Sequence, residues 1–279
     1  MNTIIGLGKA GCAIADKFSQ YPQYKIYKID SENLDGNDKR ARLLKRKDTP
    51  EEYEESAPSM KTFFRYTTDD ELFVVSGAGI VSGTSLRILQ QLSKKNISIL
   101  YIKPDLEFLG KANTLQERLV RNVLQEYARS SAITRLYMVD NKVIEDIIGD
   151  VPIVGYFDKL NDLIVSAFHM INVYNHQTPV HETPFKSSDL AKISTLGVID
   201  VESGEEKMFF SLDSISEKCY YYGINQKALE TDGKLLRRLT DSINKNSKDE
   251  DIKTTFQVHS TTYEQNYGYL IVNTGKTNN

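Results

Sequence analysis

The stretch FVVSGAGIVSGTS, residues 73–85, joins an apolar run to a turn that is rich in glycine and hydroxyl side chains. The run Leu72–Ser76 has the length and composition of a buried strand, and residues 86–94 carry the spacing of a helix. Glycines let backbone amides approach an anion closely, and hydroxyls add further donors. We therefore expect an anion-binding turn between a strand and a helix. The residues of this turn that we expect to contact the anion are Gly77, Gly79, Ser82, Gly83, Thr84 and Ser85.

A second glycine turn, GLGKAG at residues 6–11, follows the apolar run Thr3–Gly6 and precedes a helix expected over Ala13–Ser19. The start of that helix would add partial positive charge, and Lys9 a full one. Alone, this pattern fits a tight turn that binds nothing, or a dinucleotide-binding Rossmann turn with Asp30 as its ribose-binding acid. Two such turns on one sheet instead suit a mononucleotide whose phosphate chain is held from both sides.

Strand-like and helix-like segments alternate through the first half of the chain, which predicts a parallel sheet with helices on both faces. The apolar stretch Tyr156–Tyr174 predicts a central core helix. We place a boundary near residue 185, between an α/β nucleotide-binding domain (1–185) and a smaller α/β domain (186–279). In the second domain we expect strands at 196–201, 208–212 and 219–223, a helix at 235–243, and a terminal hairpin of 254–262 and 267–273.

Composition excludes several classes of function. The 35 basic and 38 acidic residues give a formal net charge of −3, so the chain has no global attraction for nucleic acid or anionic membrane. Cys12 and Cys219 lie far apart and lack metal-ligand spacing, and two thiols fit a reducing, cytoplasmic compartment. No apolar run approaches the roughly 20 residues needed to span a bilayer. His176, His181 and Glu182 lack a structured ligand spacing, so we expect no metal site.

The sequence between the two glycine turns contains a basic run, KRARLLKRK at residues 39–47, and an acidic run, EEYEE at residues 51–55. Charge runs of this kind are usually solvated helix faces. A contact surface for another subunit is the alternative interpretation.

Several segments resemble the tubulin/FtsZ superfamily and occur in the order of that family. GKAGCAIA, residues 8–15, is similar to the first tubulin nucleotide loop, and residues 73–85 are similar to the signature loop of the family. YFDKLNDLI, residues 156–164, resembles the start of the central helix, whose asparagine recognises guanine. The other matched segments are KIDSENL (28–34), ILYIKPDLEFLGK (99–111), SSDLAKI (187–193) and GYLIVNTGK (268–276).

The resemblance implies a protein that binds GTP or GDP, with Mg2+ as an accompanying ion, and that assembles head to tail into filaments. The filament would contain copies of this chain alone or a second tubulin-like protein. The resemblance assigns guanine recognition to Asn161. In the first loop it assigns the nucleotide contacts to Gly8, Lys9, Ala10, Gly11 and Cys12.

In this family, hydrolysis takes place between subunits, where acidic residues of one subunit position the attacking water at the next. Asp189 matches the first acid, and Lys192 stands where the second belongs. A lysine cannot accept a proton at neutral pH unless its pKa is strongly lowered. The resemblance therefore implies weak GTP hydrolysis at a subunit interface, or a partner subunit that supplies the acid.

Two other functions stay open, the first of them because of departures from the family's motifs. Ile80 and Val81 replace glycines of the signature loop, and Ala13, Leu109 and Asn113 replace nucleotide contacts. The first alternative is a tubulin-like structural or capping protein that has lost nucleotide binding. The second is an NAD-dependent oxidoreductase that uses the first glycine turn as a Rossmann turn.

Overall fold

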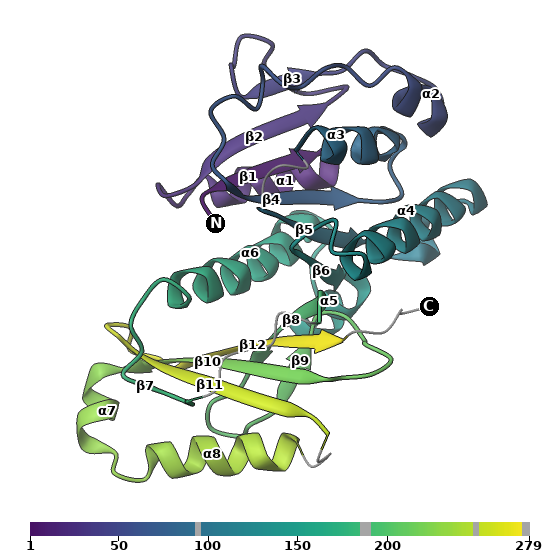
Figure 1. Cartoon of the computed structure of the whole chain (residues 1–279). Coiled ribbons are helices and arrows are strands. Elements are labelled where there is room, and N and C mark those ends of the chain that lie inside the picture. The colour runs from purple at the N-terminus through teal and green to yellow at the C-terminus, as the bar shows by residue number, and fades with distance from the viewer. Residues whose placement is uncertain (93–95, 185–190, 248–250, 275–279) are drawn as a thin grey trace. The chain divides into compact units, whose positions relative to one another are not determined.

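The contacts of the computed structural model divide the chain into two compact units, Met1–Val165 and Ser166–Asn279 (Figure 1). The division falls within helix α6 (Tyr156–Tyr174), before the boundary that we expect from the sequence near residue 185. Among the described residues, no helix is long and apolar enough to cross a membrane. The α/β class predicted from the sequence is confirmed. The structure describes all residues except 93–95, 185–190, 248–250 and 275–279.

The first unit contains a parallel sheet with the strand order β3-β2-β1-β4-β5-β6. Residues of β1 and β4 are buried almost throughout, because helices cover both faces of a parallel sheet. This explains why both strands are continuous apolar runs in the sequence. The strands are β1 (Thr3–Leu7), β2 (Lys25–Asp30), β3 (Ala41–Leu43), β4 (Asp70–Ser76), β5 (Asn96–Lys103) and β6 (Arg135–Asp140).

The strand order reverses between β1 and β4. From β1 the chain crosses to β2 on one side, and from β4 it crosses to β5 on the other. Right-handed crossovers then place α1 on one face of the sheet and α3 and α4 on the opposite face, which Figure 1 draws in front. The helices are α1 (Gly8–Phe18), α2 (Pro50–Glu55), α3 (Ser85–Leu92), α4 (Lys111–Arg129) and α5 (Asn141–Ile148), with 3-10 turns η1 (Ile80–Thr84) and η2 (Leu106–Phe108).

Helix α1 begins at Gly8, five residues before the helix start expected at Ala13, because there is no loop between it and β1. Gly6 and Gly11 make this direct strand-to-helix passage possible. A Cβ at Gly6 would lie 2.7 Å from the Gly11 carbonyl carbon, and a Cβ at Gly11 would lie 3.2 Å from the carbonyl carbon of Val74. Two of the three glycines in this turn therefore serve close packing of the helix on the sheet.

The second unit contains a sheet with the strand order β8-β12-β10-β11-β7, and β9 pairs with β8. The terminal hairpin expected from the sequence is wrong. Strands β11 and β12 both exist, but β10 lies between them, parallel to β11 and antiparallel to β12. The strands are β7 (His181–Glu182), β8 (Ile193–Ile199), β9 (Glu206–Met208), β10 (Glu217–Asn225), β11 (Lys253–Thr261) and β12 (Tyr267–Thr274), and the helices are α7 (Gln226–Thr231) and α8 (Leu235–Asn246).

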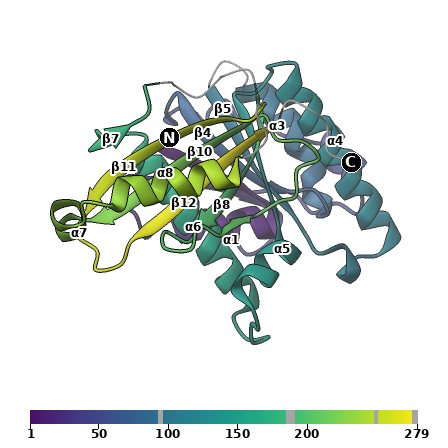
Figure 2. The ribbon, with the colours of Figure 1, turned by 90° about the horizontal axis from the view of Figure 1, so that it is seen from below.

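Strand β10 is buried along almost its whole length, which is the reason that it needs a neighbour on each side. Its side chains alternate between two helices. Lys218 donates to the carbonyl oxygen of Asn246 at the end of α8, at 2.9 Å. On the other face, Gly223 leaves room for Tyr174 at the end of α6. Figure 2 shows α8 lying along the strands of this sheet.

Candidate functional site

A cavity of about 550 Å3 opens at the carboxyl edge of the first unit's sheet. Leu7, the last residue of β1, and Ser76, the last residue of β4, both line it. This is the point at which the strand order reverses, and ligands of open α/β sheets bind in the crevice at such a point. The volume suits a small-molecule ligand.

The first glycine turn presents backbone groups to this cavity. Gly8, Lys9 and Ala10 line the cavity and form the first turn of α1. Leu7, in the capping position, makes no side-chain hydrogen bond to them. The first amides of a helix lack partners within the helix, so these three are donors for an anion. Gly8 has φ of +69°, a conformation that favours glycine.

The two glycine turns lie next to each other, and residues of both line the cavity. A Cβ at Gly8 would lie 3.9 Å from Cβ of Val81, which is van der Waals contact. Gly79, Ile80, Val81 and Ser82 line the cavity on the side of the second turn. Residues of both turns therefore lie within reach of one small ligand in this cavity.

The hydroxyl groups of Ser82 and Thr84 in the second turn form hydrogen bonds within the turn itself. Residues 80–84 form η1, in which the Ser82 hydroxyl donates to the Gly77 carbonyl oxygen and the Thr84 hydroxyl to that of Val81, each at 2.9 Å. A Cβ at Gly83 would lie 2.7 Å from the Pro50 carbonyl carbon, so Gly83 permits packing against α2. Ile80, with 41% of its surface exposed, and Val81 take the places where glycines would expose backbone amides.

The cavity brings together about half of the nucleotide contacts predicted from the sequence. Gly8, Lys9, Ala10, Gly79, Ser82 and Asn161 line it. Gly11, Cys12, Gly77, Gly83, Thr84 and Ser85 do not line it.

Cys12 points into the protein interior. Its Sγ lies 3.5 Å from the carbonyl oxygen of Gly6 and 3.6 Å from that of Ile29, and it donates to both. Burial raises the pKa of the Cys12 thiol to about 12. The electrostatic activation that its position at a helix start suggests is therefore absent, and the thiol is neutral at physiological pH.

Sequence reasoning missed several residues that line the cavity, among them Asn141 and Phe157. Asn141 directly follows β6, and its Oδ1 is buried without a hydrogen-bond partner among the described residues. Phe157 is 64% exposed and precedes Asn161 by one turn of α6. A polar residue directly after a strand, and an aromatic residue four positions before an asparagine, are the sequence signals that could have indicated them.

Charged side chains of both signs surround the cavity. The basic run does not form the expected helix face, because residues 41–43 form the edge strand β3 and a loop follows. That loop places Arg46 at the cavity, where its guanidinium lies 3.2 Å from the Glu32 carboxylate. Burial raises the pKa of the Asp30 carboxyl, which also lines the cavity. The charged lining residues are Lys9, Arg46, Lys47, Asp30, Glu32 and Asp48.

The residues predicted for hydrolysis, Asp189 and Lys192, belong to the second unit of the chain. Asp189 lies outside the described residues. Lys192 is half-buried directly before β8, in the second unit. Their assignment stays a prediction.

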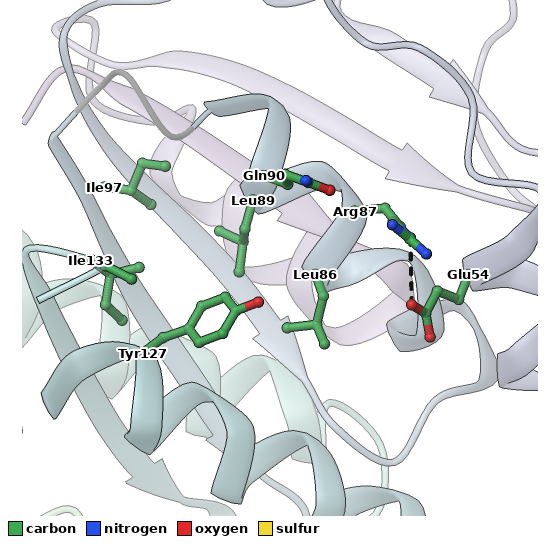
Figure 3. A pocket seen from close by; sticks show the side chains of 9 residues that line it. Glu54, Leu86, Arg87, Leu89, Gln90, Ile97, Tyr127 and Ile133 are labelled. Atoms are coloured by element: carbon green, nitrogen blue, oxygen red, sulfur yellow. Dashed lines mark ion pairs between the residues drawn. The ribbon is translucent and has the colours of Figure 1, made fainter. Parts of the chain in front are cut away.

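A second cavity, of about 450 Å3, lies between α3 and α4 in the same unit (Figure 3). Leu86 from α3, Tyr127 from α4 and Ile97 from β5 point into it, and the ion pair of Arg87 with Glu54 lies at its rim at 3.4 Å. None of the predicted site residues lines it. The first cavity is therefore the candidate functional site.

No family model matches the chain, and no curated protein matches it in sequence. Solved structures do match. An empty FtsZ dimer of M. jannaschii aligns with a TM-score of 0.71 and 11% identity, over 98% of this chain and 87% of that chain. A GTPγS-form protofilament of TubZ from Bacillus thuringiensis serovar israelensis aligns with a TM-score of 0.73 and 17% identity, over 98% and 86%. The chain has the tubulin/FtsZ fold. The fold that the ordered motifs suggested is thus confirmed.

A third structure with the tubulin/FtsZ fold is CetZ1 from Haloferax volcanii, a GDP-bound monomer. It aligns with a TM-score of 0.68 and 15% identity, over all of this chain and 95% of that chain. Identities of this size show a common fold.

Proposed function

We propose that the cavity binds a guanine nucleotide and that the bound nucleotide controls head-to-tail assembly of the protein into filaments. The observation that carries this proposal is the approach of the two glycine turns, with Gly8 and Val81 in contact range and both lining one cavity. Turns from the two strands at the reversal point line this one cavity, and the first of them offers the amides at the start of α1 as donors for a phosphate chain. TubZ protofilaments and an FtsZ dimer share this fold, which supports assembly.

The phosphates would lie against the start of α1. The amides of Gly8, Lys9 and Ala10 would donate to phosphate oxygens, and the positive end of the helix dipole adds to the attraction. Arg46 and Lys47 from the opposite loop bring two further positive charges to the same cavity. Basic side chains that contact phosphate form charge-assisted hydrogen bonds.

The base would lie at the other end, near α5 and α6. The Asn161 amide and the orphaned Oδ1 of Asn141 offer both donors and acceptors to the edge of a purine. Guanine presents a carbonyl acceptor and amine donors, which amide groups match. Phe157 has an exposed ring one turn from Asn161 and supplies a stacking surface.

Mg2+ would enter with the nucleotide. Among the described residues, no group of three histidine, cysteine or acidic side chains is placed to hold a metal ion. Mg2+ at phosphate sites commonly keeps several waters and uses one or two carboxylates. Asp30 and Asp48, which line the cavity, are the nearest candidates for this role.

Hydrolysis would be weak in a filament made only of this chain. Lys192 stands where an acidic residue would position the attacking water, and loss of such a group lowers a rate about 10²–10⁴-fold. Asp189 would be the remaining acid that this chain offers to its neighbour. A second tubulin-like subunit could supply the missing carboxylate in a copolymer.

A structural or capping protein without nucleotide is the second candidate. The exposed Ile80 and the neighbouring Val81 favour it, because their aliphatic side chains occupy the wall where an anion would need donors. The two candidates predict opposite results for the purified protein.

Nucleotide content and sedimentation separate them. The purified protein is denatured and any released nucleotide is identified by chromatography; binding of a fluorescent GTP analogue is then measured with GTP or ATP as competitor. We expect guanine nucleotide and GTP-dependent pelleting. Asn161→Ala should weaken GTP binding about tenfold or more, because it removes a buried amide that would pair with the base. Asn122→Ala, at an exposed position of α4, should not. Protein that is empty and shows no saturable GTP binding would contradict the proposal.

A further inference from the structure

We infer that Tyr101 is a positioning residue that holds the second glycine turn in place against the cavity, through a buried ion pair on α4. The expected effect of Tyr101 on nucleotide affinity rests on the proposed function. The expected effect of Tyr101 on the position of the turn rests only on the contacts between residues. The residues involved are Tyr101 on β5, Glu117 and Arg121 on α4, and Gly77 and Ser82 in the turn.

The contacts form an unbroken series from the cavity to α4. Ser82 lines the cavity, and its hydroxyl donates to the Gly77 carbonyl oxygen at 2.9 Å. The Gly77 amide hydrogen-bonds the Tyr101 hydroxyl. That hydroxyl donates to Oε1 of Glu117 at 2.9 Å, and Nε of Arg121 donates to the same oxygen at 3.0 Å.

Every member of the series beyond the turn is shielded from water. Tyr101 has no exposed surface, Glu117 has 1% and Arg121 has 6%. A buried ion pair is stable only when its remaining hydrogen-bonding positions are filled, and the tyrosine hydroxyl fills one on Glu117. Because the Tyr101 O–H points to Glu117, the hydroxyl oxygen is left as an acceptor for the Gly77 amide.

Among the described residues, the hydroxyl hydrogen bonds of the second glycine turn do not tie its start, at Gly77, to another element. Its hydroxyl hydrogen bonds, from Ser82 and Thr84, remain within the turn itself. Gly77 fits beneath Tyr101 only because it has no side chain, since a Cβ there would lie 3.2 Å from Cα of Glu117 and still closer to the Tyr101 hydroxyl. The network therefore fixes the start of the turn, and with it the position of Ser82.

The second unit offers a matched control with the same chemistry. The Tyr220 hydroxyl donates to Oε1 of Glu206 at 2.6 Å, and Nζ of Lys218 donates to Oε2 of the same carboxylate at 2.7 Å. Tyr220 is 1% exposed and Lys218 is 5% exposed. This tyrosine–glutamate–cation cluster belongs to a different unit from the cavity. Tyr220→Phe thus removes an equivalent buried hydroxyl without touching the turn.

Two measurements on Tyr101→Phe and Tyr220→Phe test the inference. The first is amide hydrogen exchange of the peptide that covers residues 77–85, in protein without added nucleotide. The second is affinity for a fluorescent GTP analogue. We expect Tyr101→Phe to raise exchange in that peptide and to weaken the affinity, each about tenfold, because it leaves a buried carboxylate position and the Gly77 amide unpaired. Tyr220→Phe should leave the exchange of this peptide and the affinity unchanged, even if it lowers the midpoint of urea denaturation as much as Tyr101→Phe does.

The possible results are distinguishable. Unchanged exchange at residues 77–85 in Tyr101→Phe overturns the inference, and so does an equal effect of Tyr220→Phe on this peptide. If Tyr101→Phe raises exchange but the wild-type protein binds no nucleotide, the positioning role stands and the proposed function fails. If exchange rises and nucleotide affinity is unchanged, Tyr101 holds the turn but the turn does not hold the nucleotide.

Discussion

The two glycine turns look alike in sequence but use their glycines differently. In the first turn, Gly8 adopts a left-handed conformation and the helix starts at once, so that backbone amides face the cavity. In the second turn, Gly77 and Gly83 are positions of close packing, and η1 presents the aliphatic side chains of Ile80 and Val81. Glycine therefore marks either an exposed backbone or a tight contact, and only the surroundings distinguish the two.

The largest effect should come from filling a packing glycine. In Gly6→Ala, the new methyl group would lie 2.7 Å from the Gly11 carbonyl carbon and 2.8 Å from the Cys12 nitrogen, so α1 must move away from β1. We expect the free energy of unfolding in urea to fall by about 2–3 kcal/mol. Gly79→Ala is the control, because nothing lies within 4 Å of its Cβ position. Equal losses in the two variants would show that packing does not distinguish these glycines.

A smaller effect should follow from Gly8→Ala. Its φ of +69° is unfavourable for alanine by about 1–2 kcal/mol, and relief of that strain would shift the amides at the start of α1. Thermal unfolding should occur at a lower temperature, and affinity for a GTP analogue should fall several-fold. Gly36→Ala, which has open space around its Cβ position and no positive φ, should change neither. Unaltered affinity in Gly8→Ala would mean that the first turn does not hold the phosphates.

In the second turn, a substitution is expected to raise the affinity for GTP. Val81→Gly removes an aliphatic side chain from the cavity wall and exposes backbone at a position where a nucleotide needs donors. We expect GTP affinity, measured by fluorescence titration, to rise about two- to fivefold despite a small loss of stability. Val81→Leu should lower it. Weaker binding in both variants would indicate that Val81 packs against the ligand productively.

The smallest expected change concerns Cys12. Its pKa of about 12 lies above the ordinary value of 9.0, so the thiol is neutral in the folded protein over the physiological range. Burial of the neutral form contributes stability that is fully present below pH 9 and is lost as the pH rises toward 12. A thiol reagent at pH 8 should therefore react with Cys12 in urea but not in native protein. Rapid reaction of native Cys12 would place its sulfur at the cavity.

The sequence predicted those features that depend on neighbours along the chain. The alternation of apolar and helical segments located β1 and β4 and the helices α1 and α3 that follow them, and the glycine clusters located both turns. It did not reveal that β10 separates β11 from β12, because strand order is set by long-range pairing. Nor did it show that Cys12 points inward while Asn141 faces the cavity. The direction of a side chain depends on what packs around it.

The position of β12 has a consequence for synthesis of the protein. β12 follows every other strand of its sheet in sequence, yet it pairs with β8 on one side and β10 on the other. On a ribosome, the sheet of the first unit can close once residue 140 has emerged. The second sheet is complete only once residue 274 has emerged, and until then the edges of β8 and β10 that face β12 leave their backbone N–H and C=O groups without a partner strand.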